Sequence, residues 1–160
     1  MRLYIIKFLY CFIFIGATFS QKLLIPMDQL QTDHLKAYGV AFWTLKKGEE
    51  VDWLLNYRGG SFLINYDGIL ERELKIRGVY YEPVNTAVLM EIFAQIEENN
   101  MDMVLLEKLP KIAVYSPPDN QPWDDAVTLA LTYAEIDYEV IFDEEVLTDK
   151  LKDYDWLHLH

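Results

Sequence analysis

Short apolar runs alternate with helical periodicity in the first part of the chain. The run 22–26 is apolar and ends at a proline, which predicts a buried strand. Thr32 or Asp33 can cap a helix that runs to about Lys47, because Gly48 is a typical stop. Four apolar residues recur in this helix at helical spacing and are predicted to face the core: Leu35, Tyr38, Phe42 and Leu45.

Two further strands are predicted on either side of a pair of glycines. Residues 51–57 and 61–66 are rich in aromatic and branched side chains, and an Arg-Gly-Gly run at 58–60 separates them. The glycines tolerate the positive φ angles of a hairpin turn, which favours an antiparallel pair. The alternative is a buried strand that leads into a glycine loop approaching a ligand.

Two helices are predicted in the middle of the chain. The first covers about 69–76, and Gly78 follows its end. Asn85 or Thr86 begins the second, which runs through Glu98. The apolar stripe of the second helix is formed by Leu89, Ile92, Phe93 and Ile96.

Strands and helices alternate regularly in the last third of the chain. Strands are predicted over 111–115, 138–142 and 154–159, with helices from Pro122 and over 144–151 between them. This order indicates β-α-β crossovers and a parallel sheet. The predicted fold class is therefore α/β: a flavodoxin-like or Rossmann-like three-layer sandwich with a preceding α/β region. A doubly wound sheet normally has more than three strands, so we expect the sandwich to be incomplete at the C-terminus. The alternative is a true C-terminus with an edge strand.

The first twenty residues differ in composition from the rest. They contain no Asp or Glu, and they combine Arg2 and Lys7 with an apolar run and small residues before Gln21. This pattern is typical of a secretory signal peptide. An uncleaved anchor is the alternative, but the 13 residues between Lys7 and Gln21 are fewer than the roughly 20 that span a bilayer.

The predicted organisation has three parts: a signal peptide at 1–20, an N-terminal α/β region at 21–105 and the truncated sandwich at 106–160. Export would place the protein in the periplasm, in the cell envelope or outside the cell, without a membrane span after cleavage. The 160 residues are 52% hydrophobic, enough for a packed core, and carry a net charge of −12, so we expect no nucleic-acid partner. The only cysteine, Cys11, lies in the predicted signal peptide, which leaves the mature part without a thiol nucleophile or a disulfide.

The predicted loop around the two glycines is the first candidate ligand site. Two glycines, a guanidinium and a hydroxyl can together hold a carboxylate or a phosphate. Hairpin geometry explains the glycines equally well, and the arginine would then only be solvated. The candidate residues are Asn56, Arg58, Gly59, Gly60 and Ser61.

The second candidate site lies at the carboxyl ends of the predicted parallel strands, where open α/β sheets bind ligands. The loop after the first strand contributes Ser116, Asp119 and Asn120, although it also fits a rigid capped turn. His158 and His160 share one strand face, where imidazoles could serve an acid–base or metal role or simply bind a neighbouring loop. Two histidines do not define a metal site, and the loop has no GxGxxG or GxxxxGK motif, so neither metal nor cofactor is predicted.

Four runs of the mature part carry a family resemblance: LKAYGVAFW, VDWLLNYRGGSFLINYDG, KIAVYSPPDNQPWDDAV and DYDWLHLH. They resemble a group of exported bacterial proteins commonly labelled asparagine synthetase B. The resemblance implies a longer protein whose later part is a class I glutamine-amidotransferase-like domain with a flavodoxin-like fold. The chain would then be an N-terminal fragment.

The sequence does not match the catalytic residues of asparagine synthetases. Glutamine-dependent asparagine synthetases have a cysteine directly after the initiator methionine, where this chain has Arg2, and the run 58–61 departs from their SGGxDS loop. We therefore expect an exported binding or scaffolding module without a visible catalytic set, whose partner is a small molecule or an envelope protein. One alternative is a hydrolase or glutamine amidotransferase with its nucleophile beyond residue 160, and another is asparagine synthetase itself.

Overall fold

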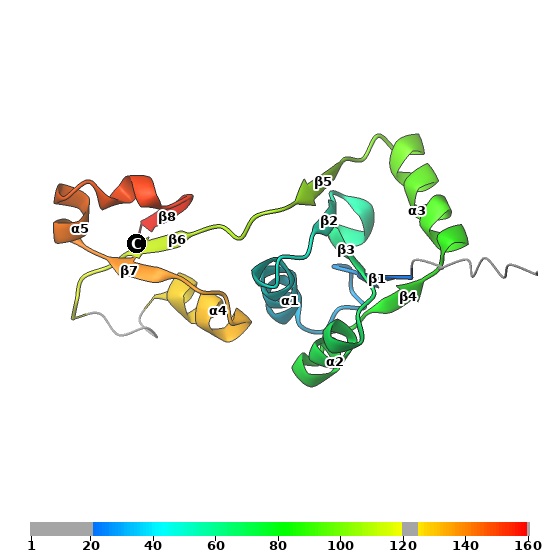
Figure 1. Ribbon diagram of the computed structural model, residues 1–160, viewed down its shortest axis with the longest axis horizontal. Coiled ribbons are helices and arrows are strands. Elements are labelled where there is room, and N and C mark those ends of the chain that lie inside the picture. The colour runs from blue at the N-terminus through cyan, green and yellow to red at the C-terminus, as the bar shows by residue number, and fades with distance from the viewer. Residues whose placement is uncertain (1–20, 120–124, 160) are drawn as a thin grey trace, which may run out of the picture.

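The computed structural model describes residues 21–119 and 125–159 and contains two sheets (Figure 1). The strands of the first sheet are β1 (Lys22–Ile25), β2 (Val51–Leu54), β3 (Ser61–Asn65), β4 (Glu82–Val84) and β5 (Met103–Leu106). Its helices are α1 (His34–Lys46), α2 (Gly68–Arg77) and α3 (Thr86–Glu98). The predicted signal peptide lies outside the described residues.

The first sheet is antiparallel throughout and has the order β4-β1-β3-β2-β5. Elements β1 to β4 follow the β-α-β-β-α-β order of the split β-α-β motif, and β5 adds a strand beside β2. The predicted hairpin is confirmed, because β2 and β3 pair with Leu54 opposite Ser61. The sequence pattern does not predict β4 or β5.

Helices cover both faces of the first sheet. Helices α1 and α2 pack on one face, in a core that includes Leu23 of β1 and Leu74 of α2. Helix α3 packs on the other face through Ile92 and Ile96, which confirms its predicted apolar stripe. The first sheet therefore lies between two helical layers.

The predicted helix at 32–47 is confirmed as α1, but its predicted core face is partly wrong. Phe42 is buried, whereas Leu35 and Tyr38 are 42% and 41% exposed. The buried side consists mainly of smaller residues: Ala37, Gly39, Val40, Ala41 and Thr44. Small side chains let α1 lie close to its neighbours on two sides, so packing rather than hydrophobicity decides which face is covered.

The second sheet is parallel, as predicted, with the order β7-β6-β8. Its strands are β6 (Ile112–Tyr115), β7 (Glu139–Ile141) and β8 (Trp156–Leu159). They are connected by α4 (Ala126–Ala134), α5 (Asp143–Leu147) and a 3₁₀ turn (Lys150–Asp153). The chain is thus a mixed α/β protein. None of the helices in the described part of the chain is long and apolar enough to cross a bilayer.

The two crossover helices lie on opposite faces of the second sheet. Val114 of β6 packs with Leu131 of α4, whereas the ring of Tyr115, the next residue, lies 5.2 Å from the ring of Phe142 directly before α5, measured between ring centres. The helix predicted from Pro122 begins instead at Ala126, since the Asp125 side chain accepts a hydrogen bond from the Val127 amide at 2.8 Å. Pro122 itself lies outside the described residues.

The chain has two units, each formed by one sheet and its helices, and helices α1 and α4 join them (Figure 1). Gly39 lies so close to α4 that a Cβ there would be 1.9 Å from the carbonyl oxygen of Ala134. Beside this contact, Lys36 pairs with Glu135 at 2.7 Å and lies 4.8 Å from the centre of the Tyr133 ring. The close backbone approach makes this helix pair the main structural link between the sheets.

Candidate functional site

The loop between β2 and β3, the first predicted site, is shaped by its contact with a neighbouring segment. Tyr57–Gly59 forms a 3₁₀ turn, and Asn56 and Arg58 have left-handed φ angles of 66° and 45°. A Cβ on Gly59 would lie 2.3 Å from the carbonyl oxygen of Met27. Only glycine permits this approach, so the close contact with the segment after β1 explains why position 59 is a glycine.

The next two residues also serve the structure of the loop. Gly60 has a φ of 94°, and its carbonyl accepts a hydrogen bond from the Trp53 indole at 3.1 Å. The Ser61 hydroxyl is fully buried and donates to the carbonyl of Tyr57 at 3.0 Å. The hydroxyl predicted to contact a ligand therefore closes the loop.

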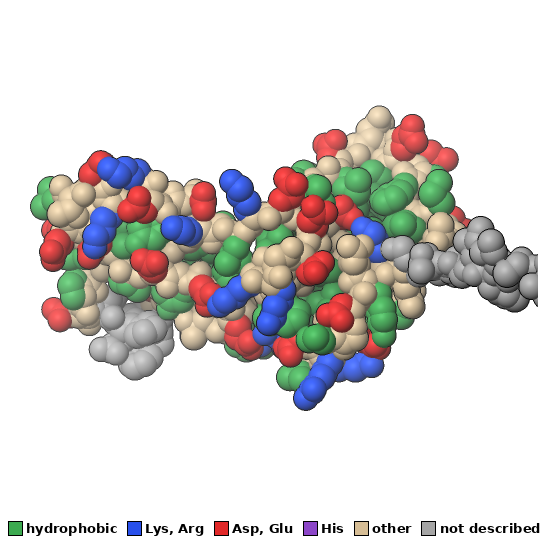
Figure 2. Space-filling model, in the orientation of Figure 1, with side chains coloured by type: hydrophobic (Ala, Val, Ile, Leu, Met, Phe, Trp, Pro, Cys, Tyr) green, Lys and Arg blue, Asp and Glu red, His purple; other side chains and the backbone are tan. Residues whose placement is uncertain are grey.

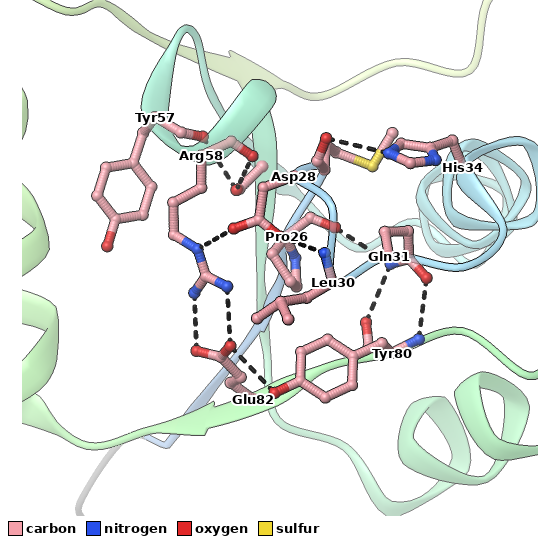
Figure 3. A network of polar contacts seen from close by, with 11 residues as sticks. Pro26, Asp28, Leu30, Gln31, His34, Tyr57, Arg58, Tyr80 and Glu82 are labelled. Carbon is pink, nitrogen blue, oxygen red and sulfur yellow. Dashed lines mark hydrogen bonds and ion pairs between the residues drawn. The ribbon is translucent and has the colours of Figure 1, made fainter.

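The Arg58 guanidinium is held by two carboxylates (Figure 3). Its Nε donates to Asp28 at 2.7 Å, and its two terminal nitrogens donate to the two oxygens of Glu82 at 2.9 and 3.0 Å. The hydrogen bonds to Glu82, and then the one to Asp28, raise the pKa of Arg58, while Arg58 lowers the pKa of Asp28. An external anion would have to displace one of these carboxylates to reach the guanidinium.

A buried glutamine extends this network, and no sequence motif points to it. Gln31 donates to the carbonyls of Pro26 and Tyr80, both at 3.1 Å, and accepts from the Tyr80 amide at 3.1 Å (Figure 3). The Tyr80 hydroxyl in turn donates to Glu82 at 3.2 Å. We call the linked residues the Arg58 cluster: Asp28, Gln31, Arg58, Tyr80 and Glu82. The cluster ties together the segment before α1, the β2–β3 loop and the start of β4, which is a structural role.

The second predicted site is brought partly together at the carboxyl end of the second sheet. Val114 lies opposite His158 in the β6–β8 pair, so Ser116 lies at the same edge as the end of β8. Ser116 is buried, and its amide donates to the carbonyl of Ile141 at 3.0 Å, whereas Asp119 is exposed. Two of the predicted residues lie outside the described part of the chain: Asn120 and His160. Within residues 21–119 and 125–159, no group of three His, Cys, Asp or Glu side chains could hold a metal ion.

An apolar groove of about 380 Å³ lies between the two units. Figure 2 shows hydrophobic side chains at the surface where the units meet. Helix α1, strands β2, β3 and β5, the segment before β6, and elements β6, α4 and β8 all contribute to its walls. Its aromatic lining is formed by Tyr38, Phe42, Trp53, Phe62 and Trp156. The groove combines residues that are distant in the sequence, so no local motif predicts it.

The groove has an aromatic wall and few polar side chains. Phe62 stacks on Trp53 with ring centres 6.2 Å apart and forms a T-shaped pair with Tyr38, with ring centres 5.5 Å apart. Among the described residues that line it, Lys108 is the only charged one, and none is a serine, histidine or acid. Trp156, which is 51% exposed, forms part of the rim. This arrangement suits binding of an apolar group.

Comparison with protein-family models, curated proteins and solved structures found no match to this chain.

Proposed function

We propose that the chain is an exported α/β binding module that holds an uncharged apolar small molecule in the groove between its two sheets. The observation that carries this proposal is the apolar, aromatic-lined groove itself. Binding sites for small molecules are commonly concave, mostly apolar and located where two structural units meet. Export is proposed from the composition of residues 1–20, with their basic start, apolar middle and small-residue end.

The size of the groove limits the class of ligand. An apolar protein cavity of about 150 Å³ is sufficient for benzene. The groove measures about 380 Å³, which suits a molecule of two or three rings or an acyl group of similar bulk. Lys108 in its lining can extend its ammonium into water while its aliphatic part covers the apolar surface.

The charge of the chain favours a neutral ligand. Its net charge of −12 creates a negative potential that opposes the approach of anions. A cation would lack a carboxylate in the groove, because none of the described lining residues is acidic. A neutral apolar molecule avoids both costs.

Titration with the neutral fluorophore N-phenyl-1-naphthylamine tests this proposal. We expect saturable binding at one site, with energy transfer from the groove tryptophans. Replacing Trp156 by Ala should raise the dissociation constant about fivefold, since one aromatic contact contributes about 1 kcal/mol. The control Leu147→Ala removes a side chain that is 85% exposed and outside the groove, and should leave the constant within about twofold.

The anionic probe 1-anilinonaphthalene-8-sulfonate provides the charge control. It has a similar ring system, so a groove that selects neutral ligands should bind it more weakly than N-phenyl-1-naphthylamine. Non-saturable binding of the neutral probe, or equal effects of Trp156→Ala and Leu147→Ala, would rule out the groove as its site.

A second candidate function rests on the strand order of the second sheet. Counted from β6, the order β7-β6-β8 is 2-1-3, which is how the flavodoxin-like order 2-1-3-4-5 begins. This order supports the proposed flavodoxin-like fold, in which Ser116, directly after β6, would lie at the switch point between β6 and β8. In a hydrolase or amidotransferase of this fold, the nucleophile would come from chain beyond residue 160. A nucleophile elbow followed by a histidine and an acid in that region would favour the enzyme.

A further inference from the structure

Strand β5 leaves an apolar edge of the first sheet open. It pairs with β2 on one side, and among the strands of residues 21–119 and 125–159 it is the last of the sheet on the other (Figure 1). Three successive side chains are well exposed: Met103 at 48%, Val104 at 40% and Leu105 at 47%. Successive residues of a strand point to opposite faces, so the sheet is uncovered on both faces at this edge.

An edge of this kind is unusual in a protein that remains monomeric. Open edges are normally protected by charged residues, by proline or by a bulge, because their unpaired amides and carbonyls attract another strand. Strand β4, at the opposite edge of the sheet, has such protection, since it contains Glu82 and Pro83. Strand β5 reads Met-Val-Leu-Leu and has neither a charge nor a proline.

We propose that a second copy of this chain pairs antiparallel with β5, about a two-fold axis at Leu105. In this register Leu105 faces the partner's Leu105, and Val104 faces the partner's Leu106. All the central contacts are then apolar and lie on matching faces of one continuous sheet.

The charges that flank β5 select this register. Asp102 precedes the strand and Lys108 follows two residues after its end. With the axis at Leu105, Asp102 lies opposite the partner's Lys108, and the symmetry produces this pair of opposite charges twice. The neighbouring antiparallel registers are shifted by two residues and centred on Val104 or Leu106, because a shift by one would put opposed side chains on different faces. They place Asp102 opposite the partner's Leu106, or Lys108 opposite the partner's Val104, and so lose both pairs of opposite charges.

The pairing keeps equivalent faces of the two sheets on the same side. Val104 lies opposite Trp53 in the β2–β5 pair, so it is on the face that bears the groove. The sheet faces that α1 covers in the two copies would therefore form one continuous face across the two-fold axis. The inference concerns the strand edge alone and does not depend on what the groove binds.

Sedimentation velocity of the purified chain over a range of concentrations tests the dimer. We expect a reversible monomer–dimer equilibrium. Leu105→Lys places two like charges at the axis and should weaken dimerisation by at least about tenfold. Its matched control is Leu159→Lys on β8, another edge strand, where the leucine is 67% exposed. The control should leave the equilibrium unchanged.

A charge exchange tests the register separately. Asp102→Lys alone and Lys108→Asp alone each create two like-charge pairs and should weaken the dimer several-fold. The double variant restores opposite charges and should return the dissociation constant to within about twofold of the original. Circular dichroism verifies that each variant is folded.

The outcomes test three parts of the proposal separately: the edge that pairs, the register and the choice of partner. A wild-type chain that stays monomeric at every concentration would overturn the proposal, as would a dimer broken by Leu159→Lys and not by Leu105→Lys. Failure of the double charge exchange to rescue the dimer would overturn the register centred on Leu105. A complex of β5 with an apolar peptide in place of a second copy would overturn the choice of partner.

Discussion

The contact between α1 and α4 predicts that a single methyl group destabilises the protein. Gly39 lies inside α1, and a Cβ built on it meets backbone atoms of Ala134, with the carbonyl oxygen at 1.9 Å and the carbonyl carbon at 3.0 Å. Ordinary contacts of this type begin at about 3.4 Å, so α4 would have to withdraw by about 1.5 Å. Backbone atoms cannot rotate away as the end of a side chain can, so the whole helix must shift.

Two opposing effects determine the size of the change in Gly39→Ala. Alanine is favoured over glycine inside a helix by about 1 kcal/mol, which stabilises the variant. Overpacking of a close contact costs about 1–3 kcal/mol, and a shift of α4 would also disturb the Lys36–Glu135 pair. We therefore expect a net loss of about 1–2 kcal/mol in the free energy of unfolding. The same glycine-to-alanine change at an open helical site would instead increase stability.

Urea unfolding, followed by both tryptophan fluorescence and circular dichroism, measures this change. The matched control is Gly68→Ala at the start of α2, because a Cβ there meets no atom within 4 Å. The free energy of unfolding of the control should lie within about 0.5 kcal/mol of that of the original chain, or above it. If Gly39→Ala is as stable as Gly68→Ala, then α1 and α4 are not in this close contact and the reasoning is refuted.

Two further predictions concern the Arg58 cluster. Gln31→Leu leaves buried polar groups of Pro26 and Tyr80 without their partner. The free energy of unfolding measured in urea should therefore fall by about 2–4 kcal/mol. A loss no larger than that of the exposed control Gln95→Leu would contradict this. Arg58 lowers the pKa of Asp28 in the folded state, so Asp28 contributes stability above its ordinary pKa of 3.8, and this contribution is lost as the pH falls below that value. The difference between urea midpoints at about pH 6 and about pH 3 should therefore shrink in Asp28→Asn, and an unchanged difference would exclude the ion pair as its source.

Helix positions could be predicted from the sequence where the signals are local. Helix α3 begins after Asn85, whose side chain accepts from the Val88 amide at 3.0 Å, and helix α2 ends at Gly78 in a left-handed conformation. The parallel sheet follows from the alternation of apolar strands with helices, which needs no knowledge of distant contacts. Each of these features is indicated by local sequence patterns, although the strands of the sheet are themselves distant in the sequence.

Features that depend on distant partners could not be predicted. Strand β4 contains Pro83, which argues against a strand until its edge position is known, and β5 is defined only by its pairing with β2. Arg58 looks solvated in the sequence because its partners lie 30 and 24 residues away, at Asp28 and Glu82. Gln31 gives no signal at all, since its role depends on contacts 49 residues away, with Tyr80.

Helix α1 explains why the groove cannot be assigned to either unit alone. Val40 belongs to the core of the first sheet, whereas Phe42, two residues later, is buried in the core of the second sheet with Ile112. Both Phe42 and Ile112 also line the groove. A cut between β5 and β6 would therefore remove one wall of the groove and expose apolar residues on both sides of the cut. Although the sheets are separate, the close approach of α1 to α4 at Gly39 makes their packing interdependent, and a ligand in the groove would stabilise the joined arrangement because only that arrangement contains its site.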